Sequence, residues 1–216
     1  MDSNQLAGSE LILNSDGSIY HLQLHPEDIA NTIITVGDPD RVATVSKYFD
    51  EIELKKQCRE FTTHTGIYKG KRLSVVSTGI GTDNIDIVFN ELDALVNIDL
   101  KTRRIRAEHQ QLTLVRIGTS GALQPDIPVD SFLASEIAIG FDNLMHFYQG
   151  ADIIDNDFSS ALMQHTQWDA AKSDPYVVAS DPELLKLFTK DMISSGVTVT
   201  NVGLYGPQGR SLRLPL

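Results

Sequence analysis

Three short turns built from small residues follow three apolar runs of the chain, at residues 37–41, 77–81 and 116–121. Their sequences are Gly-Asp-Pro-Asp-Arg, Ser-Thr-Gly-Ile-Gly and Arg-Ile-Gly-Thr-Ser-Gly. Small residues at the end of a buried strand leave backbone N–H groups open, and proteins cradle phosphate with such groups. Arg41 and Arg116 add fixed positive charge to two of these turns. The pattern predicts one site for a small anion at the ends of buried strands.

Composition excludes several classes of protein. The chain has 216 residues, of which 41% are hydrophobic, and this is enough for the core of one α/β domain. A formal net charge of -11 argues against nucleic-acid binding, which usually needs a basic face. The single cysteine, Cys58, permits no intrachain disulfide, and residues 1–5 lack a secretory pattern, so we expect a cytoplasmic protein. No apolar run approaches the roughly 20 residues that span a bilayer, which predicts no membrane association.

Strands that alternate with helices predict an α/β sheet. Residues 1–19 are polar and aperiodic and are expected to form a loose lead-in to a domain over residues 20–216. The expected strands are residues 33–36, 61–65, 73–76, 112–117, 132–135 and 197–202, with a hairpin turn at 69–71. The expected helices are residues 41–48, about 82–96 and 181 to about 195.

Other patterns favour structural interpretations. The turn at 79–81 lacks the third glycine of a dinucleotide fingerprint, so no nucleotide cofactor is expected. Pro26 interrupts the helix that would place His21 and His25 on one face, so we expect no metal site. The charged run at 101–109 is interpreted as a solvated connection.

The order and spacing of four segments resemble the nucleoside phosphorylases, over nearly the whole chain from about Tyr20 to Arg210. These segments are residues 37–41, 59–63, 77–81 and 116–121. Gln208-Gly209-Arg210 is similar to the uracil-reading pair of the uridine phosphorylase branch. The resemblance implies phosphorolysis of uridine to uracil and ribose 1-phosphate, with inorganic phosphate as a substrate and no cofactor.

The resemblance also implies roles for individual residues. Catalysis would rest on Arg41, Arg116 and Arg210. The implied phosphate contacts are Gly37, Arg41, Arg59, Arg116, Gly118 and Thr119. The implied base contacts are Ser120, Gly121, Tyr205, Gln208 and Arg210, and the implied ribose contacts are His21 and Thr119. His21 and Arg59 would reach the site of a neighbouring subunit, which implies a homo-oligomer, either a dimer or a hexamer.

The sequence thus predicts a single α/β domain in which helices flank a central mixed twisted sheet, as in nucleoside phosphorylases. The Glu-Met-Glu segment that binds ribose hydroxyls in that family has no match here, so the domain is expected to be C-terminally incomplete. Three alternatives stay open at this point. They are a purine nucleoside phosphorylase, a nucleosidase that uses water, and an inactive fragment that binds nucleoside and phosphate.

Overall fold

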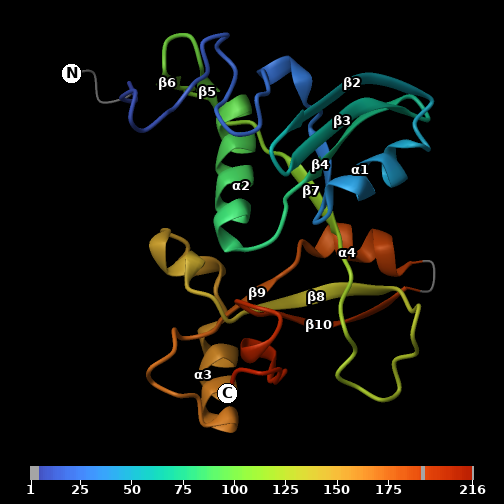
Figure 1. Cartoon of the computed structure of the whole chain (residues 1–216), viewed down its shortest axis with the longest axis vertical. Helices are drawn as coiled ribbons and strands as arrows, with labels where there is room; N and C mark the ends of the chain where they lie inside the picture. The colour runs from blue at the N-terminus through green and yellow to red at the C-terminus, as the bar shows by residue number, and fades with distance from the viewer. Residues whose placement is uncertain (1–4, 191–192, 216) are drawn as a thin grey trace. The chain divides into compact units, whose positions relative to one another are not determined.

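The computed structural model describes residues 5–190 and 193–215. The chain forms two compact units, Met1–Thr119 and Ser120–Leu216. Each unit contains its own sheet and its own helices (Figure 1).

The first unit is built on a five-stranded mixed sheet in the order β2-β3-β4-β1-β7. Its strands are β1 (Thr32–Val36), β2 (Glu51–Cys58), β3 (Phe61–Tyr68), β4 (Lys71–Ser77) and β7 (Thr113–Ile117). Strand β1 pairs in parallel with both β4 and β7, whereas β2, β3 and β4 are antiparallel. The predicted mixed α/β class is therefore confirmed, and β2 is a strand that the sequence pattern did not predict.

Two helices cover the two faces of this sheet (Figure 1). Successive residues of a strand point to opposite faces. On one face, Val36 and Val75 pack with Val42 of α1 (Pro39–Ser46). On the other face, Ile33, Val76 and Phe61 pack with the apolar stripe of α2 (Thr82–Asn97), which includes Val88, Leu92 and Leu95. Because the sheet is covered on both faces, β1 carries apolar residues on both, with Ile33 on one face and Ile34 and Val36 on the other.

The segment before β1 packs on the α2 side of the first unit. Leu11 and Ile19 are buried there, and Leu13 forms a β-bridge with Ile19. A short 3-10 helix, η1 (Pro26–Asp28), leads into β1. The apolar residues of this segment recur with neither helical nor strand periodicity, so the sequence gives no local signal of this packing.

A small hairpin follows α2. It consists of β5 (Ile98–Asp99) and β6 (Arg104–Ile105), so part of the charged run at 101–109 forms a strand. The carboxylate of Asp99 accepts hydrogen bonds from the backbone N–H groups of Lys101 and Thr102 and closes the turn. The residues from Arg104 to Gln110 are exposed, as expected for a solvated connection.

The second unit is built on a three-stranded sheet in the order β10-β8-β9. Its strands are β8 (Leu133–Gly140), β9 (Tyr176–Ala179) and β10 (Ser194–Thr200). Helix α3 (Asn156–Thr166) packs beside β9, and helix α4 (Pro182–Thr189) packs beside β8. Three 3-10 turns complete the unit, namely η2 (Leu144–Phe147), η3 (Ala151–Ile153) and η4 (Gly206–Gln208).

The predicted helix from residue 181 to about Ser195 is too long. Asp181 caps α4 as its acidic side chain suggests, but the helix ends at Thr189. Ser194 and Ser195 belong instead to β10, where they pair with Leu133 and Ala134 of β8. Strand pairing outweighs helix propensity here because the serines and Gly196 are weak helix formers. Residues 191–192 of the predicted helix lie outside the described residues.

Candidate functional site

The three small-residue turns meet at one edge of the sheet in the first unit. Val36, the last residue of β1, is in register with Ser77 at the end of β4 and with Ile117 at the end of β7. Because the three strands are parallel, the turns that follow them start side by side. The strand register therefore brings the starts of the three predicted turns to one edge of this sheet.

Glycine is required at position 79, in the turn after β4. Gly79 has φ +67°, and a Cβ atom there would overlap Asn84 Nδ2. The N–H of Thr78 donates to the carbonyl of Val36 over 2.8 Å and ties the turn after β4 to the end of β1. A Cβ atom on Gly37 would lie 3.7 Å from Arg116 Nη2. The turns thus leave room for a guanidinium group above the end of β1.

Two arginines supply positive charge at this edge. Arg116 Nη1 donates to Thr78 Oγ1 over 3.3 Å. Arg41 lies in the first turn of α1, where Asp38 caps the helix and accepts from the N–H of Asp40. Partial burial and then the positive charge of Arg41 lower the pKa of Arg116, although an arginine stays charged at neutral pH. Two guanidinium groups close enough to repel each other are suited to share one anion.

The remaining predicted phosphate contacts on this edge are Gly118 and Thr119, which follow β7 directly. Arg59 has a different contact from the Arg116–Thr78 pair. Its guanidinium carbon lies over the Tyr20 ring, 5.7 Å from the ring centroid. Tyr20 in turn packs edge-on against His21, with ring centroids 4.8 Å apart. The two residues that the resemblance assigned to a neighbouring subunit, His21 and Arg59, therefore share a cluster around one tyrosine.

Five predicted base contacts belong to the second unit. Tyr205, Gln208 and Arg210 lie in one exposed turn around η4, in which the N–H groups of Gln208 and Arg210 both donate to the Tyr205 carbonyl. Gly209 has φ +68°, a conformation that favours glycine. Ser120 and Gly121 are exposed at the start of the unit. Gln208 and Arg210 are exposed residues of this turn, with only Gly209 between them.

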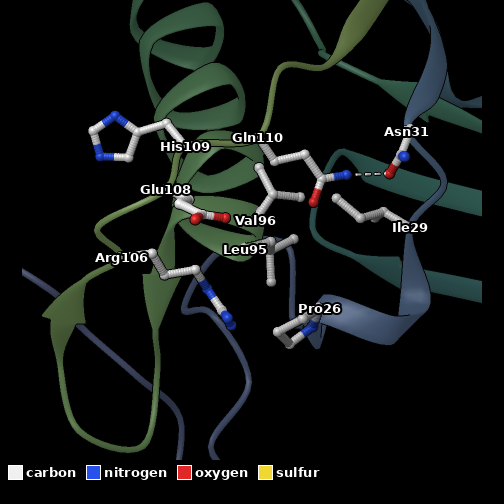
Figure 2. A pocket seen from close by; sticks show the side chains of 9 residues that line it. All are labelled: Pro26, Ile29, Asn31, Leu95, Val96, Arg106, Glu108, His109 and Gln110. Atoms are coloured by element: carbon white, nitrogen blue, oxygen red, sulfur yellow. Dashed lines mark hydrogen bonds between the residues drawn. The ribbon is translucent and has the colours of Figure 1, made fainter.

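A hollow of about 410 Å³ in the first unit is lined by other residues (Figure 2). The charged segment after β6 forms one side through Arg106, Glu108, His109 and Gln110, and the amide of Gln110 donates to Asn31. None of the predicted site residues lines this hollow. Among residues 5–190 and 193–215, no three His, Cys, Asp or Glu side chains come together as metal ligands.

Two polar contacts at these clusters were not predicted from the sequence. Thr78 binds Arg116, and Glu91 of α2 binds His21. Glu91 sits between Val88 and Leu95 on the apolar stripe of its helix, and an acid within such a stripe is a detectable signal. Its partner could not be identified from the sequence, because the two residues are 70 positions apart.

Comparison with known proteins identifies relatives. The family model described as "Phosphorylase superfamily" matches residues 31–209 and runs across both compact units, so both are parts of one family domain. A uridine phosphorylase from Thermococcus kodakarensis is 34% identical over 133 residues, which are 62% of this chain and 43% of that protein. A DeoD-type purine nucleoside phosphorylase from Levilactobacillus brevis is 34% identical over 134 residues, 62% of this chain and 52% of that protein. The chain spans about half the length of these curated relatives.

The fold matches solved structures over most of the chain. The crystal structure of a Trypanosoma brucei nucleoside phosphorylase, described as showing uridine phosphorylase activity, superposes with a TM-score of 0.79. That match has 28% identity and covers 94% of this chain and 72% of the other. In the described part of the chain, every helix is too short or too polar to cross a membrane.

Proposed function

Because the chain belongs to the phosphorylase superfamily, we propose that it cleaves uridine with inorganic phosphate to give uracil and ribose 1-phosphate. The observation that carries the proposal is the convergence of Arg41, Arg116 and three small-residue turns at one sheet edge. The shared strand register leaves backbone N–H groups and two guanidinium groups at one place, which suits a phosphate dianion.

In this proposal Arg41 and Arg116 hold phosphate, together with Gly37, Gly118 and Thr119. Phosphate attacks the anomeric carbon of the ribose as the glycosidic bond breaks. The transition state has oxocarbenium character, and negative charge grows on the departing base. Fixed cations and backbone donors stabilise such charge without reorganisation during the reaction. No metal or organic cofactor is needed for this chemistry.

Gln208 and Arg210 support uracil as the base. The Gln208 side chain offers both a donor and an acceptor, which matches the amide edge of uracil. Arg210 can neutralise charge that develops on a uracil carbonyl oxygen, so no separate proton donor to the base is required. Tyr205, Ser120 and Gly121 would complete the base contacts. Because a DeoD-type relative is equally similar to this chain, a purine nucleoside is the second candidate substrate.

His21 and Arg59 are proposed to act on the site of a neighbouring subunit. Their common cluster around Tyr20 supports this proposal, since one surface of the first unit would then deliver a ribose contact and a phosphate contact together. The active form would be a cytoplasmic homo-oligomer.

Replacing Arg210 by alanine tests the assignment of the base. We expect the kcat/KM for uridine to fall by about 10²- to 10³-fold, the range found when one charge-stabilising donor is removed. The KM for phosphate should stay near the wild-type value. Arg213→Ala is the matched control, because it removes another exposed arginine only three residues away. Unchanged uridine turnover in Arg210→Ala, or an equal loss in Arg213→Ala, would contradict the assignment.

A further inference from the structure

The carboxylate of Glu91 binds the His21 segment through three donors. The N–H of His21 lies 3.0 Å from Oε1, the N–H of Leu22 donates to Oε2 over 2.9 Å, and His21 Nδ1 lies 2.6 Å from Oε1. The Glu91 side chain is 12% exposed, and that of His21 is 25% exposed. A carboxylate this far removed from water needs such donors to offset its lost hydration.

The loop that carries His21 is fixed from other directions as well. Leu22 and Leu24 are buried in the core. The N–H of Gln23 donates to the Ile19 carbonyl, and the N–H of Ile19 donates to the Leu24 carbonyl, so the loop closes on itself. Since Tyr20 packs edge-on against the imidazole, the ring is held by the loop, by Tyr20 and by Glu91.

The contact with Glu91 also determines where the imidazole carries its proton. A carboxylate can only accept hydrogen bonds, so Nδ1 must be the donor at 2.6 Å. A neutral imidazole with a proton on Nδ1 has its lone pair on Nε2. The partly exposed edge of His21 therefore offers a hydrogen-bond acceptor.

We propose that Glu91 is a positioning residue that holds His21 in the Nδ1-protonated form and directs Nε2 to accept a hydrogen bond from the ribose 5′-hydroxyl. This proposal rests on the proposed function, in which His21 contacts that hydroxyl. Glu91 itself does not touch substrate. It acts through the imidazole and through the two backbone N–H groups that fix the loop.

The first test compares uridine with 5′-deoxyuridine in Glu91→Gln. Glutamine has the same shape but replaces one acceptor oxygen with an NH₂ group, which cannot accept from these donors. We expect kcat/KM for uridine to fall about tenfold, the effect of losing one hydrogen bond. Turnover of 5′-deoxyuridine should not change, since this substrate lacks the hydroxyl. If Glu91 had a merely structural role, kcat/KM would fall equally for uridine and 5′-deoxyuridine, and this result would overturn the proposal.

Two further variants sharpen the comparison. Glu53→Gln removes the carboxylate of another ion pair, which Glu53 forms with Arg72 on the neighbouring hairpin. This variant should leave kcat/KM unchanged for both substrates. His21→Ala should lower kcat/KM for uridine as Glu91→Gln does. In the double variant His21→Ala/Glu91→Gln, kcat/KM for uridine should fall no further than in His21→Ala alone. Additive losses in the double variant would show that Glu91 does not act through His21.

The tautomer gives a readout that does not depend on turnover. Nitrogen-15 NMR of His21 in the wild-type protein at pH 8 should show a protonated Nδ1 and an unprotonated Nε2. Glu91→Met, which removes both acceptor oxygens, should shift the ring towards the Nε2-protonated tautomer. A wild-type His21 protonated at Nε2 would refute the positioning role. If the wild-type protein does not cleave uridine at all, the proposed function fails, and the NMR result still decides what Glu91 does to His21.

Discussion

Arg116 and Thr78 are joined by a hydrogen bond of 3.3 Å across the end of a strand that lies between them. Arg116 belongs to β7 and Thr78 follows β4, and β1 separates these strands in the sheet. The guanidinium lies beside Gly37, the residue that follows β1, since a Cβ atom built there would be 3.7 Å from Arg116 Nη2. Arg116 thereby connects the turn after β7 with the turn after β4 and lies next to the start of the turn after β1.

Removal of Arg116 should weaken phosphate use in particular. We expect Arg116→Ala to raise the KM for phosphate and to lower kcat/KM by roughly 10²-fold, because a charge-assisted contact to the anion is lost. Steady-state kinetics with phosphate as the varied substrate measure the effect. Arg106→Ala, which removes an arginine that lines the hollow in Figure 2, is the control and should behave as wild type. An unchanged KM for phosphate in Arg116→Ala would contradict the placement of the anion.

Gly79 should be less tolerant of a side chain than Gly70. Both residues have positive φ, at +67° and +74°, so alanine strains the backbone by about 1 kcal/mol at either position. At Gly79 the new Cβ would also displace Asn84, whose side chain donates to the Ile80 carbonyl, whereas the space at Gly70 is open. We expect the urea midpoint to fall further for Gly79→Ala than for Gly70→Ala, and phosphate binding to weaken only in Gly79→Ala. Equal urea midpoints for the two variants would contradict this prediction, because the turn after β4 would then accommodate the added Cβ without further loss of stability.

His64 should make the stability of the protein depend on pH. Burial, and then the positive charge of Lys55, lower the pKa of His64, and its Nδ1 lies 2.7 Å from Ser46 Oγ. The unfolded chain takes up this proton near the ordinary histidine pKa of about 6.5, above the pKa in the folded state. The contribution of His64 to the free energy of unfolding is therefore fully present above about pH 6.5 and decreases as the pH drops below that value.

Thermal unfolding between pH 7.5 and pH 5.5 measures this dependence. His64→Asn keeps a polar atom near the Nδ1 position but cannot titrate, so its Tm should fall less over this range than that of the wild type. The same pH dependence in both proteins would assign the effect to other groups.

The parts of the fold with strong local signals could be predicted from the sequence. The β-branched run before Gly37, the Asp38 cap and the hairpin turn at Gly70 each fix the backbone through residues next to one another. Strand β2 has no such signal, since charged and polar residues fill most of this edge strand, which pairs with β3. The sheet supplies a pairing edge that the isolated segment does not reveal.

The residues of the candidate site also divide into those with a local sequence signal and those brought together only by tertiary packing. Gly37, Arg41 and Arg116 stand in motifs that are readable one at a time, and the parallel register of β4, β1 and β7 brings those motifs together. The pairing of Glu91 with His21 depends on how α2 packs against a loop 70 residues earlier. Contacts of that kind arise from tertiary packing, so only the structure identifies them.

Phosphate-dependent release of uracil from uridine is the most direct measurement of the proposed reaction. The 216-residue protein would be incubated with uridine, with and without inorganic phosphate, and the loss of ultraviolet absorbance of the nucleoside followed, with inosine as the comparison substrate. Release of uracil and ribose 1-phosphate only when phosphate is present, and faster than the cleavage of inosine, is the predicted result. Release without phosphate, a preference for inosine, or binding of uracil and phosphate with no turnover would contradict the account.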